Sequence, residues 1–374
     1  MKITEKTIDA IIENVNNTKR NDYIMGINEL IADFVDNNDA VFSSTHFGGT
    51  VTPNMVALQQ LNSMLMPGLN QFHQQVSSRG MIDLYVNAFN RLSKTTDKSC
   101  MVRTSDYDNK TTMRACLSPR YNRIDDDVVI ESIIDAIGSK SEFSDKFKSI
   151  GGNLTDTNTF LKFVSREPVF SIDADGRHRD FSAGLIFSNS ETGHGTCQVQ
   201  VLMIDRYCDN GCIFSYTHIG AFRLIHSGAD PSAIGRVGYI APPQVSNSKL
   251  RGLRDHVKGI LDAACDRSTF TGYLGMIQDT AHMKIDADDE DGIKSWVDAI
   301  GKNFDITETE KKAVVGRLLE TGDRSLFGIQ AALTDAAKYA ESYNRKIELE
   351  RIGGSMLENI PARWETIRKL VSDL

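Results

Sequence analysis

Apolar residues recur with a helical period at both ends of the chain and with a strand period in its middle. Near the start, the spacing of apolar residues over 8–15 and again over 27–34 predicts two helical faces. Residues 54–65 predict a further short helix, which Pro67-Gly68 ends. The first part of the chain is therefore expected to be helical.

The middle of the chain changes period. MIDLYVNAF (81–89) alternates apolar and polar positions, which predicts a strand. SCMVRTSDYDNKTTMRACLS (99–118) predicts a hairpin, because two alternating runs flank a polar turn. Further strands are expected around 159–165, 183–190, 197–204 and 212–217. Strands joined by short turns indicate an antiparallel sheet with one covered face.

The helical period returns at about residue 250, and helices are expected at 292–302, 308–320, 326–345 and 356–372. We find no internal repeat. These patterns predict an α+β fold in which a central antiparallel β-sheet region follows N-terminal helices and precedes a mostly helical C-terminal region. The expected parts are an N-terminal helical segment (1–75), a β-rich core with inserted helices (76–245) and a helical C-terminal region (246–374).

The amino-acid composition indicates which class of protein this is. Of 374 residues, 40% are hydrophobic and 25% are charged, as in a globular protein able to bury a sizeable core. No stretch of roughly 18 apolar residues could span a membrane, and the N-terminus contains no signal-peptide core. Six cysteines without a secretion signal are best interpreted as reduced thiols. We therefore expect a soluble cytoplasmic protein.

One segment concentrates candidate metal ligands. His194, Cys197, Cys208 and Cys212 would supply the four ligands of a structural zinc, although their spacing matches no standard zinc motif. Strand alternation instead puts Cys197 on an apolar face, and the Asn210-Gly211 pair indicates a tight turn. Buried structural cysteines are the favoured interpretation, so we expect no metal, and the zinc site stays open as the alternative.

Three consecutive aspartates, Asp125–Asp127, precede the apolar run VVIESIIDAIG. Acidic side chains at a helix start are stabilised by the unpaired first amides and by the positive end of the helix dipole. A helix cap is therefore the favoured interpretation. The alternative is a Mg²⁺ site completed by Glu131 or by Ser190-Glu191. The chain contains no phosphate-binding glycine motif, so no nucleotide cofactor is expected.

Positive charge gathers in the middle of the chain, although the net charge is −8. Residues 91–123 hold eight Lys/Arg against three Asp, and 236–258 hold five against one. A sheet face carrying arginines and tyrosines beside a basic helix would suit single-stranded nucleic acid, since cations track phosphates and aromatic faces accept bases. The alternative is a solvated charged surface. The candidate binding residues are Arg114, Arg120, Tyr121, Arg123, Lys249, Arg251, Arg254 and Lys258.

The order of three motifs resembles a phage/plasmid-like protein family, domain of unknown function family 932. These are RACLSPRYNRIDDDVVIESI (114–133), FSNSETGHGTCQVQVLMIDRYCDNGCIF (187–214) and LFGIQAALTDAAKYAE (326–341). Ala331 and Ala332 depart from the family's more frequent Asn-Ala. The resemblance implies a mobile-element context in a bacterial host and no particular reaction. The family-like positions are Arg114, Leu117, Arg120, Tyr121, Asp125, Ser190, Glu191, Gly193, Cys208, Asn210 and Gly211.

Three hypotheses of function follow. The leading one is a non-enzymatic protein that binds single-stranded DNA in replication or recombination, with strand annealing by a homo-oligomer as its sharper form. The second is a metal-dependent nuclease-like enzyme with Asp125, Asp127 and Glu191 as ligands. The third is a virion or host-protein interaction protein that acts through the acidic helical tail, where residues 279–310 carry ten acidic residues against three lysines.

Overall fold

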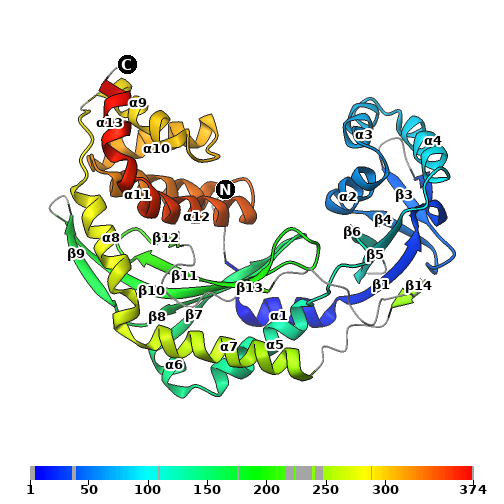
Figure 1. Cartoon of the computed structure of the whole chain (residues 1–374), viewed down its shortest axis with the longest axis horizontal. Helices are drawn as coiled ribbons and strands as arrows, with labels where there is room; N and C mark the ends of the chain where they lie inside the picture. Colours follow the sequence, from blue (N-terminus) through cyan, green and yellow to red (C-terminus); the bar gives the residue numbers. More distant parts are fainter. Residues whose placement is uncertain are drawn as a thin grey trace.

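The computed structural model describes residues 5–35, 39–107, 110–174, 177–214, 223–224, 238–240, 247–287 and 289–372. Within these ranges the chain forms a helix, then two seven-stranded β-sheets with inserted helices, then a mostly helical C-terminal region. The predicted α+β class is confirmed. In Figure 1 the two sheets lie side by side along the base of an arch, and helices rise at both of its ends.

The first sheet contains the predicted hairpin. Its strands lie in the order β14 (Gly238–Ile240), β1 (Lys19–Gly26), β5 (Ser99–Tyr107), β6 (Lys110–Leu117), β4 (Thr50–Pro53), β3 (Ala40–Ser43) and β2 (Ile31–Phe34). The β4–β6 pair is parallel and the other pairs are antiparallel. A register shift between Arg103 and Thr104 interrupts the β5–β6 ladder.

Helices α2 (Met55–Leu65), α3 (Leu69–Ser77) and α4 (Ile82–Ser93) cover one face of this sheet (Figure 1). Helix α2 confirms the helix predicted over 54–65. It begins where the Oδ1 atom of Asn54 accepts a hydrogen bond of 2.8 Å from the backbone N–H of Ala57. Such a cap satisfies one of the amides that a helix start leaves unpaired.

Helix α4 corrects the strand predicted over 81–89. The same apolar residues also fit a helical stripe, and Ile82, Tyr85 and Phe89 are completely or almost completely buried against the sheet. Leu84, which belonged to the apolar set of the predicted strand, is 46% exposed. A run of nine residues fits both periods, and packing against the sheet decides for the helix.

The helix predicted over 27–34 is also wrong. A short 3₁₀ turn (Ile27–Glu29) is followed by β2, which pairs with β3. The side chain of Asn90 on α4 binds both the N–H and the C=O of Ala32, at 2.9 and 2.8 Å. These bonds satisfy the backbone N–H and C=O groups of Ala32 on an edge strand. In a helix the same two groups would be hydrogen-bonded within the helix. Consequently residues 1–75 are helical only in part, since β1–β4 lie among their helices.

The second sheet contains the other predicted strands. Its order is β12 (Asn210–Ile213), β11 (Cys197–Asp205), β10 (Arg177–Asn189), β8 (Thr159–Ser165) and β7 (Phe147–Leu154), with β9 (Phe170–Ala174) on β10 and β13 (Arg223–Leu224) on β11. All of its pairs are antiparallel. Residues 215–217, at the end of the last predicted strand, lie outside the described ranges.

Helices enclose the second sheet. Its larger core faces α1 (Ile8–Asn17), α5 (Asp126–Gly138), α6 (Ser141–Lys146), α7 (Asn247–Cys265) and α8 (Thr271–His282), the last reached through a 3₁₀ turn at Arg267–Phe270. On the opposite face, Tyr343 and Ile347 of α12 (Tyr343–Asn359) pack on Phe160, Leu202 and Ile213. The sheet is therefore covered on both faces, as Figure 1 shows.

The C-terminal helices α9 (Glu290–Gly301), α10 (Glu308–Thr321), α11 (Leu326–Ala336), α12 and α13 (Trp364–Ser372) share a separate core. The helix predicted over 326–345 ends earlier, in a 3₁₀ turn at Ala337–Tyr339. Ser342 then caps α12, because its side chain accepts from the N–H of Arg345 at 3.2 Å. The boundary predicted near 356 falls inside α12, and a 3₁₀ turn at Pro361–Arg363 precedes α13.

Candidate functional site

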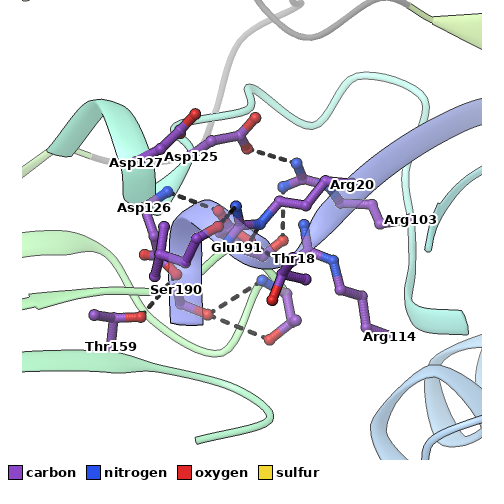
Figure 2. A network of polar contacts seen from close by, with 12 residues as sticks. Thr18, Arg20, Arg103, Arg114, Asp125, Asp126, Asp127, Thr159, Ser190 and Glu191 are labelled. Carbon is purple, nitrogen blue, oxygen red and sulfur yellow. Dashed lines mark hydrogen bonds and ion pairs between the residues drawn. The ribbon is translucent and has the colours of Figure 1, made fainter. Parts of the chain in front are cut away.

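Several predicted site residues meet in one buried polar group, which we call the arginine–carboxylate cluster. Its members are Arg20, Asp22, Arg103, Arg114, Arg123, Asp125, Asp126 and Glu191. The cluster lies on the face of the first sheet opposite α2–α4, where the start of α5 and the turn after β10 approach it (Figure 2).

Strand register explains how the sheet contributes to the cluster. Asp22 on β1 and Arg103 on β5 are directly paired across the two strands. Alternation sends their side chains to the face opposite Tyr23 and Val102, which pack with the core under α2–α4. Arg20 lies two residues before Asp22 and therefore projects to the same face. Local strand geometry thus supplies Arg20, Arg103 and Asp22, whereas Arg123 comes from the loop between β6 and α5.

Arg103 is the centre of the cluster, and its side chain is completely buried. It donates to both carboxylate oxygens of Asp22, at 2.9 and 3.2 Å, and to Asp125 at 2.5 Å. A further bond of 2.9 Å goes to the backbone carbonyl of Glu191. A buried cation is tolerated when it is paired and hydrogen-bonded in this way, so Arg103 joins β1, α5 and the 190–193 turn.

Glu191 is the carboxylate partner of Arg20 and Arg114. It accepts from Arg20 Nε at 3.1 Å and from Arg114 Nη1. Its other oxygen accepts from the backbone N–H of Asp126 at 2.6 Å. Burial on its own would raise the pKa of Glu191, but the charges of Arg114, Arg20 and Arg103 lower this pKa to about 2. Glu191 is therefore ionised at neutral pH.

Asp126 behaves in the opposite way. Burial, and then the negative charge of Glu191, raise the pKa of Asp126 to about 7. Hydrogen bonds from Thr159 at 2.7 Å and from Asn189 at 2.8 Å act against this rise without cancelling it. Two neighbouring carboxyl groups thus hold different protonation states near neutral pH, an arrangement that is frequent at functional sites.

The helix cap predicted from Asp125–Asp127 lies in the right place but works differently. Asp125 occupies the position before α5 without a side-chain cap bond, because its carboxylate binds Arg103. Glu191 supplies the carboxylate that binds the first helical N–H. The interaction joins residues 65 positions apart, so no local pattern could indicate it.

The alternative metal site is not formed in the described ranges. Asp125 and Glu191 are bound to arginines, and Asp127 is exposed, with its carboxylate on the neighbouring N–H of Val128 at 2.8 Å. Over the same ranges, no group of three or more His, Cys, Asp or Glu side chains is arranged to hold a metal ion. Asp125, Asp127 and Glu191 are therefore not a converging ligand set.

The cysteine-rich segment folds as strand β11, a turn and strand β12. Cys197 faces the core together with Val199, Val201 and Met203, as predicted, and burial raises the pKa of its thiol to about 12. The turn itself is corrected: Asp209 has the positive φ of 54°, and Asn210-Gly211 begins β12. Gly211 lies close to α12, and a Cβ atom there would make a tight contact of 3.0 Å with the Glu350 carboxylate.

The candidate nucleic-acid residues are not gathered on one surface. Arg123 and Tyr121 are buried, with Arg123 bound to Asp22 at 2.9 Å and the Tyr121 hydroxyl donating to the Ser190 carbonyl at 2.9 Å. The Arg114 side chain is 14% exposed, and Arg120 is the one residue of this group that is exposed. The face that alternation assigned to solvent is covered by segments distant in sequence.

The basic helix contributes less than its sequence indicated. Arg254 of α7 forms an ion pair of 2.7 Å with Asp135 of α5. Lys258 is half-buried. The side chains of Lys249 and Arg251 lie outside the described part of the structure. Among described side chains, α7 thus offers one paired arginine and one partly covered lysine.

Many family-like positions do converge. Gly193, with a φ of 79°, brings the turn after β10 onto Leu117 and Tyr121, and a Cβ atom at Gly193 would lie 2.8 Å from a Leu117 methyl group. Elsewhere, Asn210 donates to the Ala331 carbonyl of α11 at 2.9 Å. The positions at the cluster or beside it are Arg114, Leu117, Tyr121, Asp125, Ser190, Glu191 and Gly193.

Among the described residues, one cavity of about 580 Å³ lies between α9 and α13, and two others lie beside the cluster and the second sheet. The cavity beside the cluster, which we call the cluster cavity, has a volume of about 330 Å³ and is bordered by Arg20, Arg114, Asp126 and Glu191. The cavity beside the second sheet, which we call the basic cavity, has a volume of about 640 Å³ and lies between this sheet and α11–α12. Both volumes are in the range of small-molecule sites.

The basic cavity combines cations with an apolar wall. Its cationic side chains are Lys148, Lys162, Arg206, Lys338 and Lys346, against the carboxylates of Glu5, Asp209 and Glu350. Its apolar side chains are Ile150, Val164, Leu202 and Ile204. Two of the lysines are paired internally, since Lys162 binds Glu350 at 2.9 Å and Lys346 binds Glu5 at 2.6 Å.

The remaining cations give the basic cavity a net positive charge. Arg206 donates to Ser182 Oγ at 2.6 Å and to the Ser165 carbonyl at 3.2 Å, both uncharged acceptors. Lys148 is exposed. Sequence reasoning missed this set because its members come from separate strands and helices. The one signal was Lys162 inside the otherwise apolar strand TFLKFVS, where a charge requires a partner.

The chain matches no protein-family model, and no curated protein or solved structure is significantly similar to it. None of the helices in the described ranges is both long and apolar enough to cross a membrane. The function is therefore argued from the geometry of the cluster cavity and the basic cavity.

Proposed function

We propose that the protein binds single-stranded DNA without catalysing a reaction, and that the strand occupies the basic cavity. The observation that carries the proposal is the cation excess beside an apolar wall, five cationic side chains against three carboxylates. Phosphates are held by lysine and arginine, and the faces of unpaired bases are apolar enough to be buried against an aliphatic wall. This combination suits a single strand, whose bases are accessible.

The biological setting of the proposal comes from the resemblance to the phage/plasmid-like family. It supports a role in replication or recombination of a mobile element in the cytoplasm of a bacterial host. Strand annealing by a homo-oligomer is the sharper form of the same proposal, because repetition of the basic cavity around an assembly would extend the bound strand. This form rests on analogy with other annealing proteins and is tested after binding itself.

The binding residues differ from those expected from the sequence. Arg114, Tyr121 and Arg123 are used within the cluster, so we assign contacts with phosphates to Lys148, Arg206 and Lys338 of the basic cavity. Lys338 lies on the 3₁₀ turn after α11 and contacts Asp335 at 2.9 Å and the Cys208 carbonyl. Lys148, on the edge strand β7, and Arg206 are both exposed, whereas Lys338 is half-buried.

The test is fluorescence anisotropy of a labelled single-stranded oligonucleotide at several salt concentrations. We expect binding that weakens steeply with salt, with a log–log slope of about 0.7 for each phosphate engaged. Lys148→Glu should weaken binding and lower the slope. The matched control is Lys312→Glu, an exposed lysine on α10 that changes net charge equally and should bind as the parent protein does. Absence of binding at low salt would contradict the proposal.

A further inference from the structure

We propose that the cluster cavity is a second, separate binding site, for a small phosphate ester whose phosphate lies against Arg114 and whose hydroxylated part faces neighbouring threonine and asparagine side chains. This site does not depend on nucleic-acid binding at the basic cavity, because the two sets of lining residues do not overlap. Its ligand is a small molecule that fits a cavity of about 330 Å³.

Arg114 provides the unused hydrogen-bond donors. Its Nη1 atom binds Glu191, whereas its Nε and Nη2 atoms are buried and have no hydrogen-bond partner in the described structure. Nearly all buried donors in proteins are paired with protein, water or a bound group. A guanidinium edge with two free parallel donors matches two oxygens of a tetrahedral oxyanion. Arg20 and Lys6 border the same cavity and add positive charge.

Apart from Asp156, an exposed aspartate at its border, the rest of the cavity is lined mainly by uncharged polar side chains. Asn14 on α1, Thr112 on β6 and Asn158 between β7 and β8 form no side-chain hydrogen bonds within the described residues. All three are half-buried, so they are accessible from the cavity without being fully solvated. Hydroxyl and amide groups of this kind recognise sugar hydroxyls, since each can donate and accept. They favour a polyol phosphate over a bare anion.

Asp126 borders the cavity and would repel an anion if it were ionised. Burial and Glu191 raise the pKa of its carboxyl group to about 7, so a neutral acid group lies beside the cavity in mildly acidic solution. The groups that face Asp126 from the elements around it are Arg20 on β1, Thr159 on β8, Asn189 on β10, Glu191 on the following turn and Cys197 on β11. Glu191 is balanced by Arg20 and Arg114.

The test is calorimetric titration of the full chain at pH 6 with sulfate, ribose 5-phosphate and ribose. Sulfate stays doubly charged across the relevant pH range and probes the oxyanion site alone. We expect sulfate to bind, ribose 5-phosphate to bind at least about tenfold more tightly, and ribose to bind weakly. Arg114→Lys keeps the positive charge beside Glu191 but loses the paired donors, and should weaken ribose 5-phosphate binding at least about tenfold.

Two further variants keep the test decisive. Arg120→Lys is the matched control, because Arg120 is exposed and does not border the cavity. Thr112→Val removes a lining hydroxyl without touching the cluster, and should reduce the advantage of ribose 5-phosphate over sulfate. Absence of sulfate binding, equal affinity for sulfate and ribose 5-phosphate, or unchanged binding by Arg114→Lys would each overturn the proposal. None of these results would bear on DNA binding.

Discussion

The arginine–carboxylate cluster and the basic cavity contain similar side chains but balance their charge differently. In the cluster, four arginines face four carboxyl groups, and the side chains of Arg103 and Arg123 are fully buried. In the basic cavity, five cations face three carboxylates, and Lys148 is exposed. Paired buried charges hold segments together, whereas unbalanced exposed charges remain available to a ligand.

This difference shows why positive charge along a sequence does not by itself locate a binding surface. The basic stretch 91–123 supplied the expected DNA contacts, yet Arg103, Arg114 and Arg123 are neutralised by carboxylates from other parts of the chain. The basic cavity draws its cations from both sides of the fold and forms no basic stretch in the sequence. The two regions differ in whether carboxylates lie close to the cations in the folded protein. The density of basic residues along the sequence does not show this difference.

The largest expected effect comes from breaking the cluster at its centre. Arg103→Met should lower the free energy of unfolding by about 3–5 kcal/mol, because Asp125 would be left buried without its cation and Asp22 would keep only Arg123. Lys148→Met in the basic cavity should change it by less than about 0.5 kcal/mol, since Lys148 is exposed. Urea denaturation of both variants measures the contrast, and equal effects would contradict it.

The second prediction concerns pH. The pKa of Asp126 is raised to about 7 in the folded state, above its ordinary value of 3.8. The stability that this carboxyl group contributes is therefore fully present below about pH 4 and is lost as pH rises to about 7. Asp126→Asn removes the titrating group, so its stability relative to the parent protein should rise across this window and then level off.

Glu191 should contribute to stability with the opposite dependence on pH. The pKa of Glu191 is lowered to about 2, so its contribution is present above about pH 4.5 and is lost as pH falls toward 2. Unfolding free energies of the parent protein and Asp126→Asn, measured from pH 4 to pH 8, isolate the Asp126 contribution. A difference that is flat over this range would show that Asp126 has an ordinary pKa.

The smallest expected effect sharpens the role of the basic cavity. Glu5 lies in the cavity and binds Lys346 at 2.6 Å and Lys162 at 3.4 Å. Glu5→Gln should strengthen binding of single-stranded DNA by several-fold, because an internal carboxylate no longer competes with phosphate for these lysines. Anisotropy titrations of the variant and the parent protein measure the change. Weaker binding would mean that Glu5 positions the lysines and does not compete with the strand.

The sequence predicted the parts of the fold that depend on local pattern. The hairpin at 99–117, helix α5 and strands β8, β10, β11 and β12 of the second sheet were expected, because their alternation or helical period is clear, whereas β7, β9 and β13 were not predicted. Helix α4 was missed because Ile82, Val86 and Phe89 fit either period until a sheet is placed against them. Strand β2 was missed because its pairing with β3 depends on residues beyond its own short segment.

The candidate site was less predictable, for a different physical reason. The contacts of Arg103 with Asp22 and of Arg20 with Glu191 join residues 81 and 171 positions apart. Such separations leave no trace in local spacing, so Arg20 and Arg103 were not singled out from the sequence. Arg114, Tyr121 and Glu191 belong to motifs singled out in the sequence, but only the fold shows that Arg114 binds Glu191 and that Tyr121 binds the neighbouring Ser190.

The most direct test of the central claim is ultraviolet cross-linking of a single-stranded oligonucleotide to the full protein, with the cross-linked peptides mapped by mass spectrometry. Binding at the basic cavity predicts cross-links in β7, in the β11–β12 region and between α11 and α12, close to Lys148, Arg206 and Lys338. Cross-links confined to residues 114–123, or no cross-links under binding conditions, would contradict the assignment of the basic cavity as the DNA site.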